Sequence, residues 1–318
     1  MSLAPTLDAL YAARGNIAGA AIRTPLVRLN AEGPAEIWLK LETLQPIGSF
    51  KIRGARNAIA QCDPSALRHG VFTASAGNMG QGVAWCAREL GLPCSVVVPD
   101  HAPTTKLDAL ERLGASVIKV PWDRWWRVLV ERQYDGLGGH FIHPVADPGV
   151  IAGNGTIGLE ILEDMPNVSA VVVPYGGGGL SCGIASAVRA VRPGVPVYAC
   201  EVETAAPLAP ALAAGAPVEI AHRPSFVDGM GAKALLPEMW PLARALLAGS
   251  IVVSLEAVAK AIRLLVERNR VVAEGAGAAS VAAALTGRAG AGPIACVISG
   301  GNIDLSRLVP ILEGHVPV

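Results

Sequence analysis

The sequence has no excess of either charge and no basic run. Lys plus Arg and Asp plus Glu number 26 each, and charged residues make up 16% of the 318-residue chain. Proteins that bind nucleic acids or anionic membranes usually concentrate Lys and Arg on one surface, which this composition does not supply. The sequence therefore predicts neither a nucleic-acid partner nor a membrane partner.

The features of membrane and secreted proteins are also missing. The N-terminal segment MSLAPTLDALYAARGN has early charges and lacks the apolar core of a signal peptide. The longest uncharged stretch, between Asp164 and Arg189, contains two prolines and four consecutive glycines, which favour a strand, a loop and a helix over a membrane span. Six cysteines are scattered without CxxC pairing, as is typical of reduced thiols. These absences predict a cytoplasmic protein.

Apolar residues are abundant, at 52% of the chain, and they form strand-like runs that alternate with alanine-rich helical stretches. We expect strands at residues 71–75, 94–99, 116–121, 169–174, 195–201 and 293–299. Helices are expected between them, for example at residues 81–90, 106–113 and 180–191. Continuous Val and Ile runs separated by helices indicate parallel sheets with helices on both faces.

The order of these elements predicts an α/β protein of two domains. Residues 60–147 are expected to form a small mobile domain, and residues 1–59 with 148–318 a large one. The segment TAAPLAPALAAGAPV, residues 204–218, is interpreted as a proline-punctuated surface connection. A ligand is expected in the cleft between the two sheets, where the strands end.

The segment PIGSFKIRGARNA, residues 46–58, contains a lysine just inside a predicted helix. Ser49 is the expected N-cap, and the helix is expected to run from Phe50 towards Cys62. At 100° per residue, Lys51 shares a stripe with small apolar residues. These are Ala55, Ala58 and Cys62.

The opposite side of this helix contains Arg53, Arg56 and Asn57, which we expect to face water. Lys51 is then the one cation that points towards apolar residues. A buried ammonium is costly and readily loses its proton, which makes the amine nucleophilic. The alternative is a lysine whose stem lies along the surface while its head reaches solvent.

The loop in TASAGNMGQGVAW follows the first predicted strand. Gly77 permits a tight turn, and a helix is expected to begin near Asn78. The unpaired amides and the dipole at a helix N-terminus favour a carboxylate or a phenolate oxygen. An ordinary capped helix is the alternative.

The loop in VVVPYGGGGLSCG has four consecutive glycines between a strand and a helix. Such a run costs conformational entropy, and it lets backbone N–H groups surround an anion, most often a phosphate. A dinucleotide site is the alternative, because Glu201 ends the next strand at a suitable distance for a ribose contact. The G-x-G-x-x-G pattern fails, however, because its third glycine position is Ser181 or Cys182.

The loop in VISGGNID places Ser299 at the end of a buried strand, where its hydroxyl is available to a ligand nitrogen or to a turn. Together, the predicted cleft offers a buried amine, a phosphate loop, a helix N-terminus and a neutral hydroxyl. A phosphorylated aldehyde with a ring nitrogen would use all four. These groups therefore predict pyridoxal 5′-phosphate (PLP) as the cofactor.

The chain also resembles the fold-type II PLP-dependent enzymes, and within them the threonine/serine dehydratase branch that includes serine racemase. The resemblance covers nearly the whole chain. It rests on TPLVRLN, KLETLQPIGSFKIRGA, TASAGNMGQGVA, VVVPDHAPTTK, AGNGTIGLEI, GGGGL, AEGAGAAS and SGGN, in the family's order. It implies a two-domain fold like that of the tryptophan synthase β-subunit, with PLP bound by the large domain.

The resemblance implies a role for each matching residue. Lys51 resembles the Schiff-base lysine, Phe50 the residue packed against the cofactor, and Asn78 the partner of the ring's phenolic oxygen. Ser299 resembles the partner of the pyridine nitrogen. The phosphate loop is matched by Gly176, Gly177, Gly178, Gly179 and Leu180. The turn that binds the substrate carboxylate is matched by Ser75, Ala76 and Gly77.

The implied reaction is the dehydration and deamination of a 3-hydroxy amino acid, such as L-threonine or L-serine, to a 2-oxo acid and ammonia. The resemblance leaves open a bulkier 3-hydroxy amino acid, a racemase and a β-replacement synthase. Outside the family, a nicotinamide-dependent oxidoreductase and a non-catalytic amino-acid sensor are the alternatives. We expect a homo-oligomer, namely a dimer. The chain ends soon after SGGN, so we expect no C-terminal regulatory domain and no feedback by isoleucine.

Several positions depart from the family's pattern. Racemases of the family have a proton-donating serine where this chain has Ala76, and relatives often have histidine where it has Met79. Many relatives bind a divalent cation near the position of Glu201, but the acidic residue that follows it in them is missing. We therefore predict no metal site, with Glu201 as the one candidate ligand. In VPWDRWWRVLVERQ, a packing helix is expected, and the alternative is that Trp125 or Trp126 lines the substrate pocket.

Overall fold

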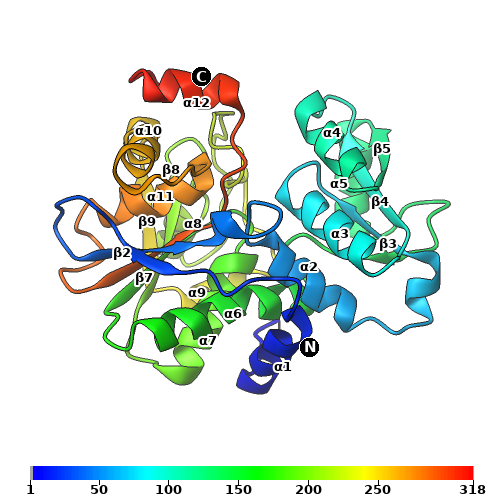
Figure 1. Ribbon diagram of the computed structural model, residues 1–318, viewed down its shortest axis with the longest axis horizontal. Coiled ribbons are helices and arrows are strands. Elements are labelled where there is room, and N and C mark those ends of the chain that lie inside the picture. The colour runs from blue at the N-terminus through cyan, green and yellow to red at the C-terminus, as the bar shows by residue number, and fades with distance from the viewer. Residues whose placement is uncertain (1–2, 318) are drawn as a thin grey trace.

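Two β-sheets organise the protein, as a computed structural model that describes residues 3–317 shows (Figure 1). The larger sheet has the strand order β1-β2-β10-β7-β8-β9, and only the β1–β2 pairing is antiparallel. Its strands are β1 Leu26–Arg28, β2 Ile37–Leu41, β7 Ala170–Pro174, β8 Val197–Val202, β9 Gly249–Val253 and β10 Ile294–Ile298. The predicted α/β class with largely parallel sheets is confirmed.

The smaller sheet is entirely parallel, in the order β5-β4-β3-β6. Its strands are β3 Val71–Ala74, β4 Cys94–Pro99, β5 Ser116–Val120 and β6 His140–Phe141. In Figure 1, α3, α4 and α5 accompany this sheet, and α2 lies between that group and the helices of the larger sheet. The domain boundaries at residues 59/60 and 147/148 stay a prediction.

Helices separate the strands, as the alternating pattern predicts. The first six are α1 Leu7–Ile17, α2 Lys51–Ala60, α3 Asn78–Glu89, α4 Thr104–Arg112, α5 Trp122–Glu131 and α6 Pro148–Asp164. The others are α7 Gly179–Val191, α8 Leu208–Ala214, α9 Trp240–Leu246, α10 Leu255–Leu264, α11 Gly275–Ala284 and α12 Leu305–Leu312. Within residues 3–317, no helix is long and apolar enough to cross a membrane.

Both faces of the larger sheet are buried, which explains its uninterrupted apolar strands. In β7, Val172 packs in a core with residues of α10 and α11, whereas Val171 and Val173 pack in a second core with residues of α6, α7 and α9. Successive residues of a strand point to opposite faces, so a sheet covered on both sides needs apolar residues at every position. The pattern of β7 therefore follows from its central place in the sheet.

Three local expectations were wrong. The segment 204–218 is not only a connection, because it contains α8 with Leu208 and Ala211 fully buried. Ser49 does not cap α2, which begins at Lys51; its hydroxyl is buried without a hydrogen-bond partner in the described chain. Arg53 does not face water but is fully buried.

The burial of Arg53 has a tertiary cause. Helix α2 packs against both α3 and α6, so the side opposite Lys51 faces protein and not solvent. Asn57 is likewise fully buried and donates to the Gly149 carbonyl at 2.6 Å. Arg56, the third of these residues, is only partly buried. The sequence thus predicted which residues share a side of α2, but not that the polar side packs against other parts of the protein.

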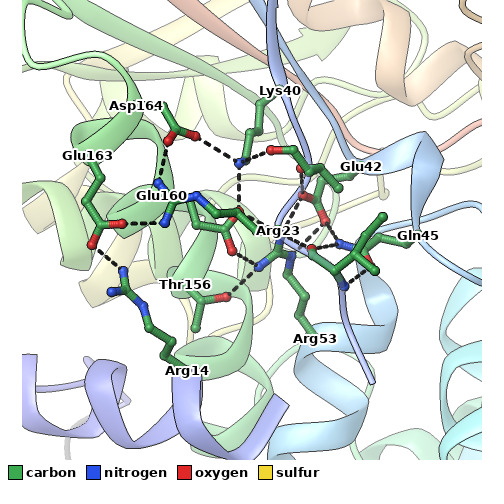
Figure 2. A network of polar contacts seen from close by, with 12 residues as sticks. Arg14, Arg23, Lys40, Glu42, Gln45, Arg53, Thr156, Glu160, Glu163 and Asp164 are labelled. Carbon is green, nitrogen blue, oxygen red and sulfur yellow. Dashed lines mark hydrogen bonds and ion pairs between the residues drawn. The ribbon is translucent and has the colours of Figure 1, made fainter. Parts of the chain in front are cut away.

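Figure 2 shows how the buried cations of this interface are paired. Arg53 forms ion pairs with Glu42 at 2.8 Å and with Glu160 of α6 at 2.6 Å. Lys40 of β2, also fully buried, pairs with the same Glu160 at 2.7 Å. Nearer the surface, Arg14 and Arg23 bind Glu163, and Arg23 also binds Asp164. The network ties α2 to the larger sheet and to α6.

Candidate active site

A cavity of about 290 Å³ collects most of the residues that the sequence predicts for a cofactor. Every residue predicted to bind the cofactor lies in its wall: Phe50, Lys51, Asn78, Gly176, Gly177, Gly178, Gly179, Leu180 and Ser299. Ser75 and Gly77 of the predicted carboxylate turn also line it, whereas Ala76 does not. Parallel strands bring their carboxyl ends to one edge of a sheet, so loops distant in sequence meet here.

Lys51 is the first residue of α2, and its side chain reaches the cavity. The Lys51 Nζ atom donates to the Pro144 carbonyl at 2.9 Å and lies 5.1 Å from the centroid of the Phe50 ring. Burial lowers the pKa of Lys51 to about 8, although the charge of Glu274 partly opposes this. A lowered pKa leaves a larger fraction of the amine neutral and nucleophilic near neutral pH.

The glycine run joins β7 to α7 and presents unpaired backbone donors. Within the described residues, the N–H groups of Gly176, Gly177 and Gly178 donate no hydrogen bond. Gly178 has φ of +96°, a conformation that favours glycine, and α7 begins at the next residue. Free N–H groups beside a helix N-terminus form a site for an anion such as a phosphate.

Asn78, the first residue of α3, is held from two sides. Its Nδ2 donates to both carboxylate oxygens of Glu274, at 2.9 and 3.1 Å. Its Oδ1 accepts from Nδ2 of Asn302 at 2.8 Å. The amide orientation of Asn78 is therefore defined.

Glu274 is the main residue of the cavity that sequence reasoning did not assign. It is the N-cap residue of α11, yet its side chain makes no cap hydrogen bond and reaches Asn78 instead. A Cβ at Gly300 would lie only 2.7 Å from its Oε1 atom, so a glycine there leaves room for the carboxylate. Burial raises the pKa of Glu274 to about 7, against the hydrogen bonds from Asn78. Its signal in the sequence was the motif AEGAGAAS, in which it is the only acid.

Ser299 follows β10 and is 2% exposed. Within residues 3–317 its hydroxyl has no hydrogen-bond partner, and the residue lines the cavity. A hydroxyl without a protein partner at the wall of a cavity is available to a ligand. The hydroxyl of Ser75, by contrast, accepts from the Gly77 N–H at 3.3 Å and shapes the turn before α3.

The cavity also has an ion pair that the sequence did not suggest. Lys106 of α4 and Asp228 both line it, and their side chains meet at 2.6 Å. Lys106 belongs to the chain segment of the smaller sheet, and Asp228 follows β8 of the larger one. The pair thus bridges the two parts of the molecule beside the cavity.

Glu201 lies elsewhere, in β8. Its carboxylate accepts from the N–H groups of Leu208 and Ala209 at 2.8 and 2.9 Å, and from the Ser250 hydroxyl at 2.7 Å. It therefore caps the start of α8, and it does not line the cavity, which contradicts the ribose interpretation. In the described part of the chain, no group of three or more His, Cys, Asp or Glu side chains is placed to bind a metal.

The tryptophans of α5 do not reach the cavity either. Trp125 packs against the core of the smaller sheet, and Trp126 is 42% exposed and stacks on Trp122. Neither Trp125 nor Trp126 lines the cavity, so the interpretation of one of them as a pocket wall was wrong. The expectation of a packing helix agrees with this arrangement.

The family model described as pyridoxal-phosphate dependent enzyme matches residues 17–300. The chain belongs to this family, and the predicted resemblance is confirmed. An L-threonine ammonia-lyase of Thermotoga maritima is 42% identical over 281 residues, which cover 87% of this chain and 70% of that protein.

Two solved structures support the fold. Maize serine racemase superimposes with a TM-score of 0.88 at 32% identity, over 98% of each chain. The processed form of threonine deaminase isoform 2 from Solanum lycopersicum does so with a TM-score of 0.86 at 29% identity, over 99% of this chain and 95% of that one. The protein is therefore a fold-type II PLP-dependent enzyme.

The cavity residues fit PLP. An amine with a lowered pKa, three backbone N–H groups without acceptors and a cavity-lining hydroxyl without a protein partner are the donors and acceptors that an aldehyde, a phosphate and a pyridine nitrogen require. Asn78 presents its amide at the wall of the same cavity. The cofactor prediction and the cavity chemistry agree.

Proposed function

We propose that the protein is a PLP-dependent dehydratase, or ammonia-lyase, which converts a 3-hydroxy amino acid such as L-threonine or L-serine to a 2-oxo acid and ammonia by α,β-elimination. The observation that carries the proposal is the Lys51 amine, with its lowered pKa, in one cavity with the unpaired backbone amides of the glycine run. The 42% identity to an L-threonine ammonia-lyase supports threonine as a substrate.

Each cavity residue has a proposed role towards the cofactor. Lys51 attaches it, Phe50 packs against its ring, and Asn78 donates to its phenolic oxygen. The hydroxyl of Ser299 meets the pyridine nitrogen, and the N–H groups of residues 176–180 bind the phosphate. When bound, PLP supplies an electron-withdrawing ring that acidifies the α-carbon of an amino acid joined to it.

The protein's own residues then control the protons. Lys51, neutral in part because burial lowers its pKa to about 8, removes the α-proton. The Ser75-Ala76-Gly77 turn holds the substrate carboxylate at the N-terminus of α3. Loss of the α-proton and of the β-hydroxyl amounts to loss of water. The released enamine then tautomerises and takes up water to give the 2-oxo acid and ammonia.

Two details of the site favour elimination. The neutral hydroxyl of Ser299 does not hold a proton on the pyridine nitrogen as a carboxylate would, so the β-hydroxyl leaves promptly. Ala76, at the position of the proton-donating serine in racemases, has no proton to give to the opposite face of the substrate. We therefore expect little racemisation, even though maize serine racemase has the same fold.

A panel of 3-hydroxy amino acids assayed for 2-oxo acid release tests the proposal. We expect L-threonine or L-serine to be turned over by a yellow preparation, with ammonia released in equal amount. Cysteine formation from O-acetylserine and sulfide would favour β-replacement instead. A colourless protein that stays inert to borohydride after incubation with PLP would refute the cofactor role of Lys51.

We also propose that the protein is a cytoplasmic homodimer with a mobile small domain, residues 60–147. The six free cysteines, five of them buried, support a reducing compartment. Light scattering of the purified protein measures the oligomeric state, and a monomer mass would contradict the dimer. Limited proteolysis near residues 60 and 147 tests the domain boundaries.

A further inference from the structure

The turn of residues 143–146 joins β6 to α6 and is folded around a buried histidine. His143 is 3% exposed. Its Nδ1 accepts hydrogen bonds from the N–H of Val145 at 3.0 Å and of Ala146 at 2.8 Å. An accepting Nδ1 has no proton, so the ring is the neutral tautomer with its proton on Nε2. The imidazole thus acts as a buried acceptor for its own turn.

This turn touches both halves of the proposed cofactor site. The Pro144 carbonyl accepts from Lys51 Nζ at 2.9 Å. Val145 packs against the glycine run so closely that a Cβ at Gly177 would lie 2.7 Å from its methyl groups. A Cβ at Gly179 would lie 2.9 Å from the Val145 carbonyl oxygen. The turn is therefore the shared support of the amine and of the phosphate loop.

The surroundings keep the imidazole neutral. Burial, with the positive charges of Arg132 and Lys51, lowers the pKa of His143 to about 3. Arg132 also donates to the Ala146 carbonyl at 3.0 Å, from the far side of the turn. The acceptor at Nδ1 consequently persists over the pH range in which Lys51 changes its charge.

We propose that His143 is a positioning residue that folds this turn, so that the Pro144 carbonyl holds the Lys51 amine and Val145 supports the phosphate loop. His143 does not line the cavity and acts through the two neighbours. The proposal rests on the proposed function, because the roles of Lys51 and of the glycine run belong to it. No step of the reaction requires a proton from His143.

Two substitutions of His143 distinguish a role as hydrogen-bond acceptor from a role in packing alone. His143→Leu keeps a branched side chain of comparable size but removes the acceptor, which leaves the buried N–H of Ala146 and the partly buried N–H of Val145 unpaired. His143→Asn retains an acceptor, because Asn Oδ1 is bonded to Cγ as His Nδ1 is. If the acceptor matters, Asn preserves the turn and Leu does not, although Leu is the more apolar replacement at a buried position.

The readout is ligand binding by apoprotein at a temperature where circular dichroism shows each variant folded. Pyridoxal, which lacks the phosphate, probes the amine by borohydride-trapped attachment at Lys51, and inorganic phosphate probes the glycine run alone. We expect His143→Leu to weaken both by about tenfold, the usual effect of leaving a buried donor unpaired. His143→Asn is expected to stay within about twofold of wild type because its acceptor remains.

Several outcomes decide the matter. Unchanged binding of both probes by folded His143→Leu would overturn the proposal while leaving the proposed function intact. A wild-type protein without a trapped adduct at Lys51 would overturn the proposed function and this inference with it. If His143→Leu does not fold, ¹⁵N NMR of wild type decides, since a protonated Nδ1 between about pH 5 and 9 contradicts an accepting role.

Discussion

Lys51 and Arg53 are cations on the same turn of α2, the first partly buried and the second fully buried, and their surroundings differ. Arg53 contacts two carboxylates, Glu42 and Glu160, which raise its pKa above the ordinary value against the effect of burial. No carboxylate of the described chain comes within ion-pair distance of Lys51, and burial lowers its pKa to about 8. Arg53, paired with carboxylates, stays protonated and stabilises the fold. Lys51, without such a partner, loses its proton more readily and is available for chemistry.

The two regions also depend on each other. The network around Arg53 fixes α2 against β2 and α6, and α2 begins at Lys51. The amine is thus presented from a rigid helix whose other side is held by ion pairs (Figure 2). Sites built on rigid elements hold reacting groups more accurately than sites on loops.

Of the substitutions that test this difference, the largest effect is expected from removing Lys51. We predict that Lys51→Ala abolishes turnover, by about 10³-fold or more, because the variant lacks both the attachment point and the base. The fold should remain, since no ion pair is broken. Assays of 2-oxo acid release and of borohydride-trapped cofactor measure the loss. Full activity of the variant would refute the assignment.

Removing the paired cation should instead damage the fold. Arg53→Met leaves the buried carboxylate of Glu42 without a cation and Glu160 with Lys40 alone, which is expected to cost about 3–5 kcal/mol of unfolding free energy. Urea denaturation measures it. In a matched control, Arg53→Met combined with Glu42→Gln should recover much of the loss, because it removes the unpaired carboxylate and keeps the pair of Lys40 with Glu160. A single variant as stable as wild type would show that the network contributes nothing.

A third substitution tests the acid that faces the unpaired amine. The folded pKa of Glu274 is raised from 4.5 to about 7, so its protonated form stabilises the fold below pH 4.5. This contribution is lost as the pH rises through about 7, by at most about 3 kcal/mol at 1.36 kcal/mol per pKa unit. Glu274→Gln should remove this part of the pH dependence.

Denaturant unfolding of wild type and Glu274→Gln across this pH window measures the difference. The wild type should lose stability relative to the variant as the pH rises, because the variant has no carboxyl to ionise. Parallel curves would mean that Glu274 titrates normally in the folded protein. Glu274→Asp offers a control that retains the charge and shortens the reach to Asn78.

The smallest effect is expected at Ser299. Ser299→Ala removes a hydroxyl that has no partner within the described protein, so stability should hardly change. Cofactor binding should weaken by about 0.5–1.5 kcal/mol, up to about tenfold, with partial activity retained. Equilibrium titration with PLP measures this change. Wild-type affinity would mean that the hydroxyl only shapes the turn.

The central strands β7 and β10 of the larger sheet could be predicted from sequence, because they have an apolar residue at every position. The strand expected at 94–99 is found at Cys94–Pro99, whereas β2 was missed. The missed strand contains Lys40, which is fully buried and paired with Glu160. A charged residue inside a core strand is acceptable only with a partner, and that partner lies far along the chain.

The same limit applies to the site. The glycine run and Ser299 stand out locally, at the ends of apolar strands, and both line the cavity. His143 has no such local mark, and Glu274 is marked only as the one acid of AEGAGAAS. The importance of both residues depends on what they contact. Ser49 was misjudged because its hydroxyl is adjacent to a helix start in sequence but does not reach the first-turn amides.

The sequence by itself determined the alternation of strands and helices, the glycine run between β7 and α7 and the place of Lys51 at a helix start. These follow from backbone freedom and from the period of apolar residues, which are local properties. Only the tertiary structure decided which charges are paired. Arg53 and Glu160 are 107 residues apart, and the pKa of Lys51 depends on Glu274 still further along the chain. Electrostatic energy depends on distance in space and on exclusion of water, and neither is written in a local pattern.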